Sequence, residues 1–291
     1  MDEGNERRRR RARLTGTLLA GVALLSLTLP AAAEAPKRIV SINLCADELL
    51  VTLADPAQIA GLSVYATDPT LSFTADAAAA FRHDASSAET VVGLNPDLVL
   101  AGRYTKRATR DMLDRLGYRV ELLDAAKSVD DSEAIIRKVA ALVGHPERGE
   151  AMIADIAAAR ARAEAAAPPG HPTAAIYQRR GYVTGGDSLS GELLAIAGFT
   201  NDGAPLAGKR GGFVPLERIV AEPPDYIVVA ASTRPAEDQG SALLAHPALA
   251  ALYPPAKRIV LPEKLTVCGG PSLPAALDWL AGEAKRIQQA P

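Results

Sequence analysis

The chain has 291 residues, of which 48% are apolar, so it is long enough to bury one large hydrophobic core or two modest ones. Aromatic residues make up only 4%, the formal net charge is −2, and no basic stripe crosses the body of the chain. A stacking platform or an electrostatic footprint for nucleic acid is therefore not expected.

Residues 1–33 have the pattern of a cleaved signal peptide. Residues 7–11 are all arginine, residues 14–29 are almost wholly apolar, and a short alanine run ends at Ala33. The apolar run is shorter than the about 20 residues that span a bilayer, which favours cleavage over an uncleaved anchor. A twin-arginine signal is a weaker alternative. Cleavage removes six arginines and three acids and leaves 26 basic and 31 acidic residues, so we predict a mildly acidic, exported, soluble protein.

The next part of the chain alternates between strands and helices. Short apolar runs predict strands, and helical patterns separate them. The runs are residues 37–42, 59–62, 97–101 and 118–123, and the helices include 48–54 and 105–116. This β-α-β-α-β-α-β order predicts a parallel sheet with helices on its faces. Residues 63–87 lack periodicity, and a loop of that length is usually functional or disordered.

Residues 128–170 break this rhythm. Ser128 is a helix N-cap candidate, a break at residues 144–146 follows, and an alanine-rich helix then continues to Ala167. We predict one long, slightly broken helical segment between two lobes; a surface helix inside a single domain is the alternative. The α/β rhythm resumes after it, with strands at 173–177 and 258–261, helices at 189–197 and 273–289, and polar loops at 178–188 and 200–212.

One stretch occurs twice. Residues 89–101 and residues 217–230 each contain a short amphipathic helical turn, a Pro-Asp pair and an apolar run, with the same spacing from Glu to Asp. A second echo is Lys-Arg-Ile-Val at residues 37–40 and at residues 257–260. We predict two similar α/β lobes, although this joint is common enough to recur by chance.

Catalytic and metal-binding patterns are weak. Residues 186–189 read Gly-Asp-Ser-Leu and resemble a hydrolase nucleophile block, but no histidine follows His246 to act as a base. We therefore expect Ser188 to cap a helix rather than to attack a substrate. The four histidines lie in unrelated loops, and no dinucleotide or phosphate-binding fingerprint is present, so neither a metal site nor a bound cofactor is expected.

Loops that leave the carboxyl ends of parallel strands are the expected place for a ligand. Arginine and tyrosine side chains there suit a large ligand with carboxylate, phosphate or phenolate groups, although any one of them is equally well explained as a solvated loop residue. The candidates are Tyr65, Arg103, Tyr104, Arg179, Arg180, Tyr182, Arg210 and Phe213, with Cys45 near them.

Residues 37–291 resemble a periplasmic substrate-binding protein of the helical-backbone class, the group that includes vitamin B12-binding and ferric siderophore-binding proteins. The segments that carry the resemblance are 38–42 with 46–50, 59–63, 89–100, 185–201 and 216–225. The resemblance implies two α/β lobes joined by one long helix, with little hinge motion, and an ABC permease as partner. We expect a monomer with a signal peptide at 1–33, an N-terminal lobe at 34–127, a connecting segment at 128–170 and a C-terminal lobe at 171–291.

On this resemblance we expect capture of a metal chelate: a ferric siderophore first, cobalamin or another corrinoid second, and haem third. The rival hypotheses are a direct metal-ion receptor and a secreted hydrolase that uses Ser188. The family's pattern also implies that Glu89 and Glu217 dock the permease, although stabilisation of a helix N-terminus would favour Glu at both positions as well.

The two cysteines, Cys45 and Cys268, each follow one of the two Lys-Arg-Ile-Val strands. If those strands are equivalent, both thiols open toward the region between the lobes, and a disulfide there would pin the lobes together. The alternatives are two separate thiols, or a Cys45 that is buried as a small apolar residue.

Overall fold

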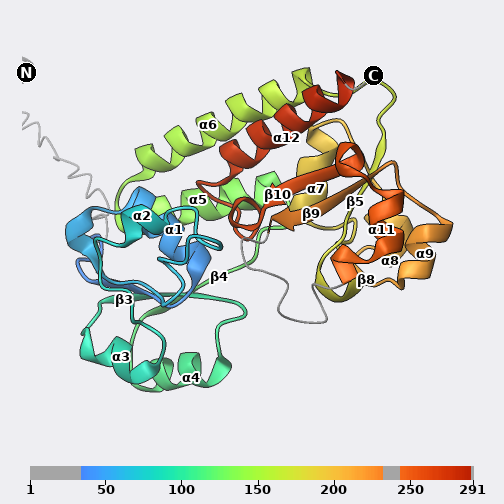
Figure 1. Ribbon diagram of the computed structural model, residues 1–291. Helices are drawn as coiled ribbons and strands as arrows, with labels where there is room; N and C mark the ends of the chain where they lie inside the picture. Colours follow the sequence, from blue (N-terminus) through green and yellow to red (C-terminus); the bar gives the residue numbers. More distant parts are fainter. Residues whose placement is uncertain (1–33, 232–242, 290–291) are drawn as a thin grey trace, which may run out of the picture. The chain divides into compact units, whose positions relative to one another are not determined.

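The computed structural model describes residues 34–231 and 243–289 (Figure 1). The predicted signal peptide lies outside the described residues. Within the described part, no helix is long and apolar enough to cross a membrane.

The N-terminal lobe contains a four-stranded parallel sheet with the strand order β2-β1-β3-β4. Its strands are β1 (Ile39–Ser41), β2 (Ile59–Gly61), β3 (Leu98–Gly102) and β4 (Val120–Leu123). Its helices are α1 (Leu44–Leu53), α2 (Ala75–Ala78), α3 (Ala88–Gly93) and α4 (Arg107–Arg115), with a 3₁₀ turn at Pro56–Gln58. β3 is buried along its whole length, as its unbroken apolar run predicts.

The C-terminal lobe contains a second four-stranded parallel sheet, with the order β10-β9-β5-β7. Its strands are β5 (Thr173–Ile176), β7 (Thr200–Asn201), β9 (Tyr226–Ala231) and β10 (Arg258–Pro262). Its helices are α7 (Leu189–Ile196), α8 (Gly203–Ala207), α9 (Leu216–Ala221), α11 (Pro247–Leu252) and α12 (Leu273–Gln288). An antiparallel ribbon of β6 (Tyr182–Val183) and β8 (Gly212–Phe213) lies within the two predicted polar loops.

The two sheets have the same topology, which confirms the prediction of two similar α/β lobes. When β3 is matched with β9, the order β2-β1-β3-β4 corresponds to β7-β5-β9-β10. The Pro-Asp pair of the repeat has the same role in both lobes. The Asp97 carboxylate accepts a hydrogen bond of 2.7 Å from the Lys37 backbone N–H at the start of β1. The Asp225 carboxylate accepts one of 2.8 Å from the Thr173 backbone N–H at the start of β5.

The second echo, Lys-Arg-Ile-Val, does not mark equivalent strands, so that part of the sequence analysis was wrong. β1 lies inside its sheet between β2 and β3, whereas β10 is the edge strand beside β9. The counterpart of β1 is β5, and the counterpart of β10 is β4. Both tetrapeptides lead into strands, but at non-equivalent positions of the two sheets, so the echo has no topological meaning.

The connecting segment forms two helices instead of one broken helix: α5 (Val129–Val143) and α6 (Pro146–Ala165). Gly144, with φ of 89°, ends α5 in the left-handed region that favours glycine. A Cβ on Gly149 would lie 2.6 Å from the Cβ of Ala140, so only glycine allows the two helices to approach this closely.

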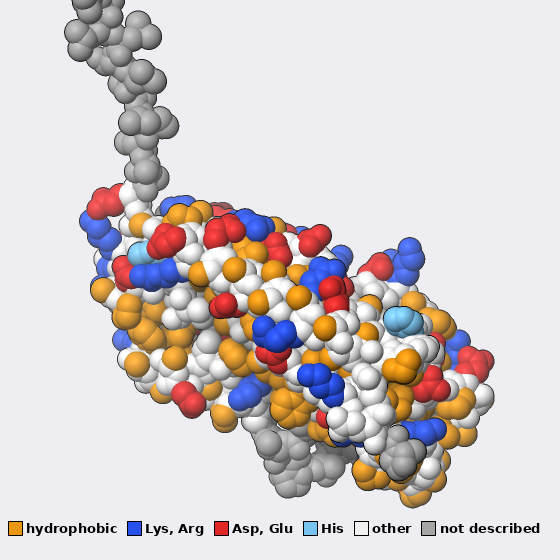
Figure 2. Space-filling view, turned by 90° about the horizontal axis from the view of Figure 1, so that it is seen from above, with side chains coloured by type: hydrophobic (Ala, Val, Ile, Leu, Met, Phe, Trp, Pro, Cys, Tyr) orange, Lys and Arg blue, Asp and Glu red, His pale blue; other side chains and the backbone are white. Residues whose placement is uncertain are grey.

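Helix α6 is the long helix that joins the lobes. Near its start, the Arg148 guanidinium donates to the Leu53 carbonyl at 2.9 Å and pairs with Asp55 at 2.7 Å, both next to the end of α1. Near its end, Arg162 pairs with Asp278 of α12 at 2.8 Å. Helices α6 and α12 run side by side (Figure 1). Figure 2 shows this face of the molecule, where acidic and basic side chains are interspersed.

One hydrophobic core extends through both lobes. It contains fully buried residues of α1, α5, α6, α7 and α12, among them Leu50, Ile136, Ile156, Leu193 and Leu277. The opposite face of each sheet packs on a smaller core of its own. Each fully buried leucine or isoleucine contributes about 1.5–3 kcal/mol. Separation of the lobes would expose part of the shared core, so the structure favours little hinge motion between them.

Candidate functional site

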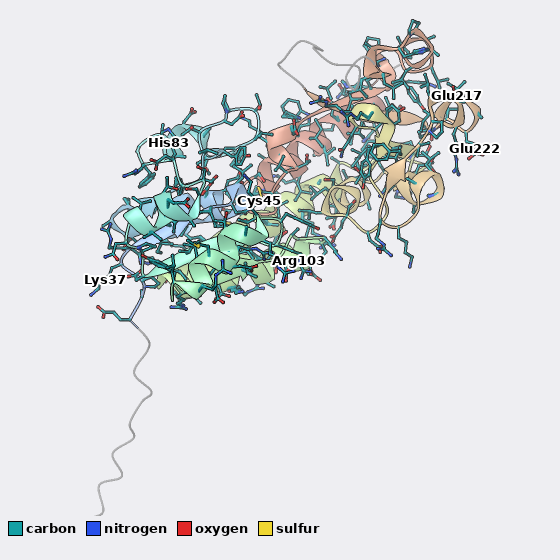
Figure 3. The ribbon with its side chains drawn as sticks, turned by 90° about the horizontal axis from the view of Figure 1, so that it is seen from below. Lys37, Cys45, His83, Arg103, Glu217 and Glu222 are labelled. Atoms are coloured by element: carbon teal, nitrogen blue, oxygen red, sulfur yellow. A yellow bond between two sulfur atoms is a disulfide. The ribbon has the colours of Figure 1, made fainter. Side chains whose placement is uncertain are left out.

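The carboxyl edge of the N-terminal sheet carries the candidates Tyr65, Arg103 and Tyr104. Tyr65 follows β2, and its side chain is 55% exposed; Tyr104 follows β3 and is 85% exposed. Figure 3 shows Cys45 and Arg103 on the side of this lobe toward the C-terminal lobe, whereas Lys37, at the other end of β1, lies on the opposite side. The candidates of this lobe therefore share one edge of the sheet, as the strand-end rule predicts.

Arg103 already has an acidic partner. Its guanidinium lies 2.6 Å from the carboxylate of Asp124, which follows the neighbouring strand β4. Both side chains are well exposed, so the pair contributes little to stability. The guanidinium is thus held at the sheet edge and still has free N–H groups for a ligand.

The C-terminal lobe brings three candidates into direct contact on the ribbon of β6 and β8. The rings of Tyr182 and Phe213 pack edge to face, with their centroids 5.5 Å apart. The Tyr182 hydroxyl donates to the Arg210 carbonyl at 3.1 Å. Phe213 is nonetheless 72% exposed. The exposed Phe213 ring, held in a fixed geometry by the half-buried Tyr182, offers a surface for a flat, apolar ligand.

A group of cations borders this aromatic pair. Arg179 and Arg180 precede β6 in a 3₁₀ turn, and Lys209 and Arg210 precede β8. Within the described ranges, Arg180, Lys209 and Arg210 pair with no acidic side chain. Arg180 has φ of 60°, a left-handed conformation that is strained for a residue with a side chain and is typical of functional positions.

The structure joins Cys45 and Cys268 by a disulfide, with their Cα atoms 5.2 Å apart (Figure 3). Cys45 lies in the first turn of α1, which the Asn43 side chain caps by accepting from the Cys45 and Ala46 backbone N–H groups. Cys268 is almost fully buried between β10 and α12. The bond therefore ties the N-terminal lobe to the C-terminal lobe across 223 residues of sequence.

Glu89 and Glu217 occupy the second position of α3 and of α9, and both are exposed. Hydrogen bonding to the Ser87 side chain lowers the pKa of Glu89, so this carboxylate is charged at neutral pH. Figure 3 shows Glu217 at the end of the C-terminal lobe away from the N-terminal lobe. The two glutamates are thus equivalent in the repeat and accessible to a partner.

Ser188 is the N-cap of α7. Its hydroxyl donates to the Gly185 carbonyl at 2.8 Å and accepts from the Gly191 backbone N–H at 3.2 Å. Both hydrogen-bonding roles of the hydroxyl are therefore used to shape the helix start, which fits the expected capping role. Within residues 34–231 and 243–289, no group of three or more His, Cys, Asp or Glu side chains is arranged to hold a metal ion.

The sequence did not point to two buried acids at the same edge, Asp47 and Glu48 in the N-terminal half of α1. The available signal was their position inside a helix that is otherwise almost entirely apolar.

Comparisons with known proteins place these features in context. The family model described as "Periplasmic binding protein" matches residues 39–258. A cobalamin-binding protein of Halobacterium salinarum is 27% identical over 215 residues, which are 72% of this chain and 58% of that protein. This chain thus spans less than two thirds of that relative's length.

Two solved structures show the same fold. The periplasmic heme-binding protein RhuT from Roseiflexus sp. RS-1 has a TM-score of 0.72 at 24% identity, over 87% of this chain and 99% of that chain. The periplasmic vitamin B12 binding protein BtuF of Vibrio cholerae has a TM-score of 0.66 at 15% identity, over 88% of this chain and 99% of that chain.

Proposed function

Since the chain belongs to the periplasmic binding protein family, we propose that it captures a metal chelate outside the inner membrane and delivers it to an ABC permease. The family match over residues 39–258 is the observation that carries this proposal. The exposed aromatic and basic side chains at the carboxyl edges of both sheets support it, because they provide apolar and cationic contacts for a ligand.

The chemistry of the C-terminal lobe narrows the class of chelate. The pair of Tyr182 and Phe213 suits the flat face of a tetrapyrrole, in keeping with relatives and fold neighbours named for cobalamin and heme. Arg180, Lys209 and Arg210, which have no acidic partner among the described residues, suit carboxylates. Haem carries two carboxylates, whereas the side chains of cobalamin are amides. We therefore rank an acidic chelate, either haem or an acidic ferric siderophore, ahead of cobalamin.

Delivery requires export and docking. The basic and apolar leader at residues 1–33 supports export by a cleaved signal peptide. The repeat-equivalent acids Glu89 and Glu217 support docking on cationic sites of the permease, where rim charges govern encounter and orientation. We propose that the receptor acts as a monomer with one ligand in contact with both lobes.

Titration of the purified, ligand-free protein with haemin, cyanocobalamin and a ferric catecholate tests the proposal. We expect a defined stoichiometry with at least one of them, the strongest binding by an acidic chelate, and a weaker complex after Arg180→Ala with Arg210→Ala. Arg160→Ala is the matched control, since Arg160 is likewise an exposed arginine, lies on α6 and pairs with Glu164. If none of the three chelates saturates the protein, it is not a chelate receptor of this kind.

A further inference from the structure

Two consecutive acids, Asp47 and Glu48, are fully buried in the N-terminal half of α1. Neither has a basic partner in the part of the chain that the structure describes. Glu48 also has one carboxylate oxygen, Oε2, that is buried without a hydrogen-bond partner among these residues. Burial of carboxylates without compensating cations is costly, so such groups call for a functional explanation.

Both acids hold the loop of residues 63–73. The Asp47 carboxylate accepts from the Ser63 backbone N–H at 3.0 Å and from the Ser63 hydroxyl at 2.5 Å. The Glu48 carboxylate accepts from the Phe73 backbone N–H at 2.8 Å. The two ends of the loop are therefore fastened to adjacent residues of one helix.

The hydrogen bonds of Asp47 continue through Ser63 to Tyr65, one of the candidate ligand contacts. The Ser63 hydroxyl, while donating to Asp47, accepts from the Tyr65 backbone N–H at 3.3 Å. Asp47, Ser63 and the backbone of Tyr65 thus form a short relay from the core of the lobe to an exposed tyrosine at the sheet edge. This hydrogen bond fixes the backbone of Tyr65, from which the exposed side chain projects at the sheet edge.

We propose that Asp47 and Glu48 are positioning residues that clamp the loop of residues 63–73 and thereby fix the backbone of Tyr65 for contact with the chelate. The ligand role of Tyr65 rests on the proposed function, whereas the clamp itself does not. The closed loop keeps both carboxyl groups out of water, where the charged form is disfavoured, and opening of the loop returns them to water. The clamp is therefore tighter when the two acids are protonated.

The clamp responds to pH near neutrality. Burial raises the pKa of Asp47 to about 7, against hydrogen bonds from Ser41 and Ser63 that lower it. Burial also raises the pKa of Glu48 to about 7, with a further contribution from the charge of Asp47. The elements packed on α1 bring no other charge to the pair. β1 and β3 carry none, and the charged side chains of α2 and α5 are exposed or paired: Asp76, Asp130, Asp131, Glu133, Arg137 and Lys138.

Hydrogen exchange of the ligand-free protein tests the clamp without assuming a ligand. After correction for intrinsic rates, the amides of residues 63–73 should exchange about five- to tenfold faster at pH 8.5 than at pH 5.5. Asp47→Asn and Glu48→Gln should each weaken this pH dependence. Asp76→Asn, which neutralises an exposed acid on α2, is the matched control and should behave as wild type. Haemin affinity of the wild type should fall in parallel as pH rises.

Two results overturn the clamp: equal protection of residues 63–73 at both pH values in the wild type, or the full wild-type pH dependence in both amide variants. If the amide variants fail to fold, the wild-type pH profile and Ser63→Ala decide, because that change removes only the hydroxyl of the relay. If the loop exchanges as predicted but the protein binds no chelate, the result supports the clamp and contradicts the proposed function.

Discussion

Removal of the disulfide tests how the two lobes are held. The bond between Cys45 and Cys268 closes a loop of 223 residues, which the chain-entropy model converts to about 5 kcal/mol of stabilisation; removal of natural disulfides generally costs about 2–5 kcal/mol. For a chain of this size, each kcal/mol corresponds to roughly 2–4 °C in Tm. We therefore expect Cys45→Ala with Cys268→Ala to lower Tm by about 5–15 °C.

The assay is thermal and denaturant unfolding of the mature protein with and without reductant. Either single alanine variant breaks the same bond, so each should cost nearly as much as the double variant, which is the non-additive result of a double-mutant cycle. Reductant should destabilise the wild type and leave the double variant unchanged. The intact mass of the non-reduced wild type should be two hydrogens below that of the reduced protein. Equal Tm values for the wild type and the double variant would refute the reasoning.

Three further predictions concern the buried acids, the ligand contacts and the docking acids. Burial raises the pKa of Asp47 and of Glu48 to about 7 in the folded state. Between about pH 4 and pH 7 the folded protein therefore binds more protons than the unfolded chain. The free energy of unfolding should fall as pH rises through that window and level off above it. The shift at Asp47 spans about three units, equivalent to about 4 kcal/mol, and urea titrations at several pH values should show a flatter profile for Asp47→Asn. Alanine at Arg103, Arg179 or Arg180 should weaken chelate binding about tenfold or more, because a charge-assisted contact is worth about 1.5–3 kcal/mol. If alanine at all three positions and at Tyr104 and Tyr182 leaves the affinity unchanged, the ligand binds elsewhere. Glu89→Lys with Glu217→Lys should abolish uptake of the chelate by cells while the purified receptor keeps its affinity, and normal uptake by this variant would rule out docking through these acids.

The fold was predictable because its signals are long and periodic. The apolar runs that became β3 and β9, each preceded by Pro-Asp, led directly to two parallel sheets of the same topology. The ribbon of β6 and β8 was not predictable, because strands of two residues have no periodicity. Its pairing depends on tertiary contacts between loops that are about 30 residues apart in the sequence.

The cysteine pair shows the limit of sequence reasoning in another way. The structure has the bond between Cys45 and Cys268, but the strands they follow, β1 and β10, are not equivalent in the two sheets. What brings the thiols together is the packing of α1 and α12 in one shared core, which no local pattern reveals. The roles of Asp47 and Glu48 were hidden for the same reason, since their partners lie 16 and 25 residues away in an irregular loop.

The most direct test of the central claim is to purify the mature protein from its native periplasm under non-denaturing conditions and to record its visible spectrum and native mass. The account predicts a bound metal chelate that adds a defined mass, absorbs in the visible range and is lost on denaturation. A protein that is colourless and carries no added mass when purified from chelate-replete cells, and that still binds none of the chelates offered in titrations, would contradict it.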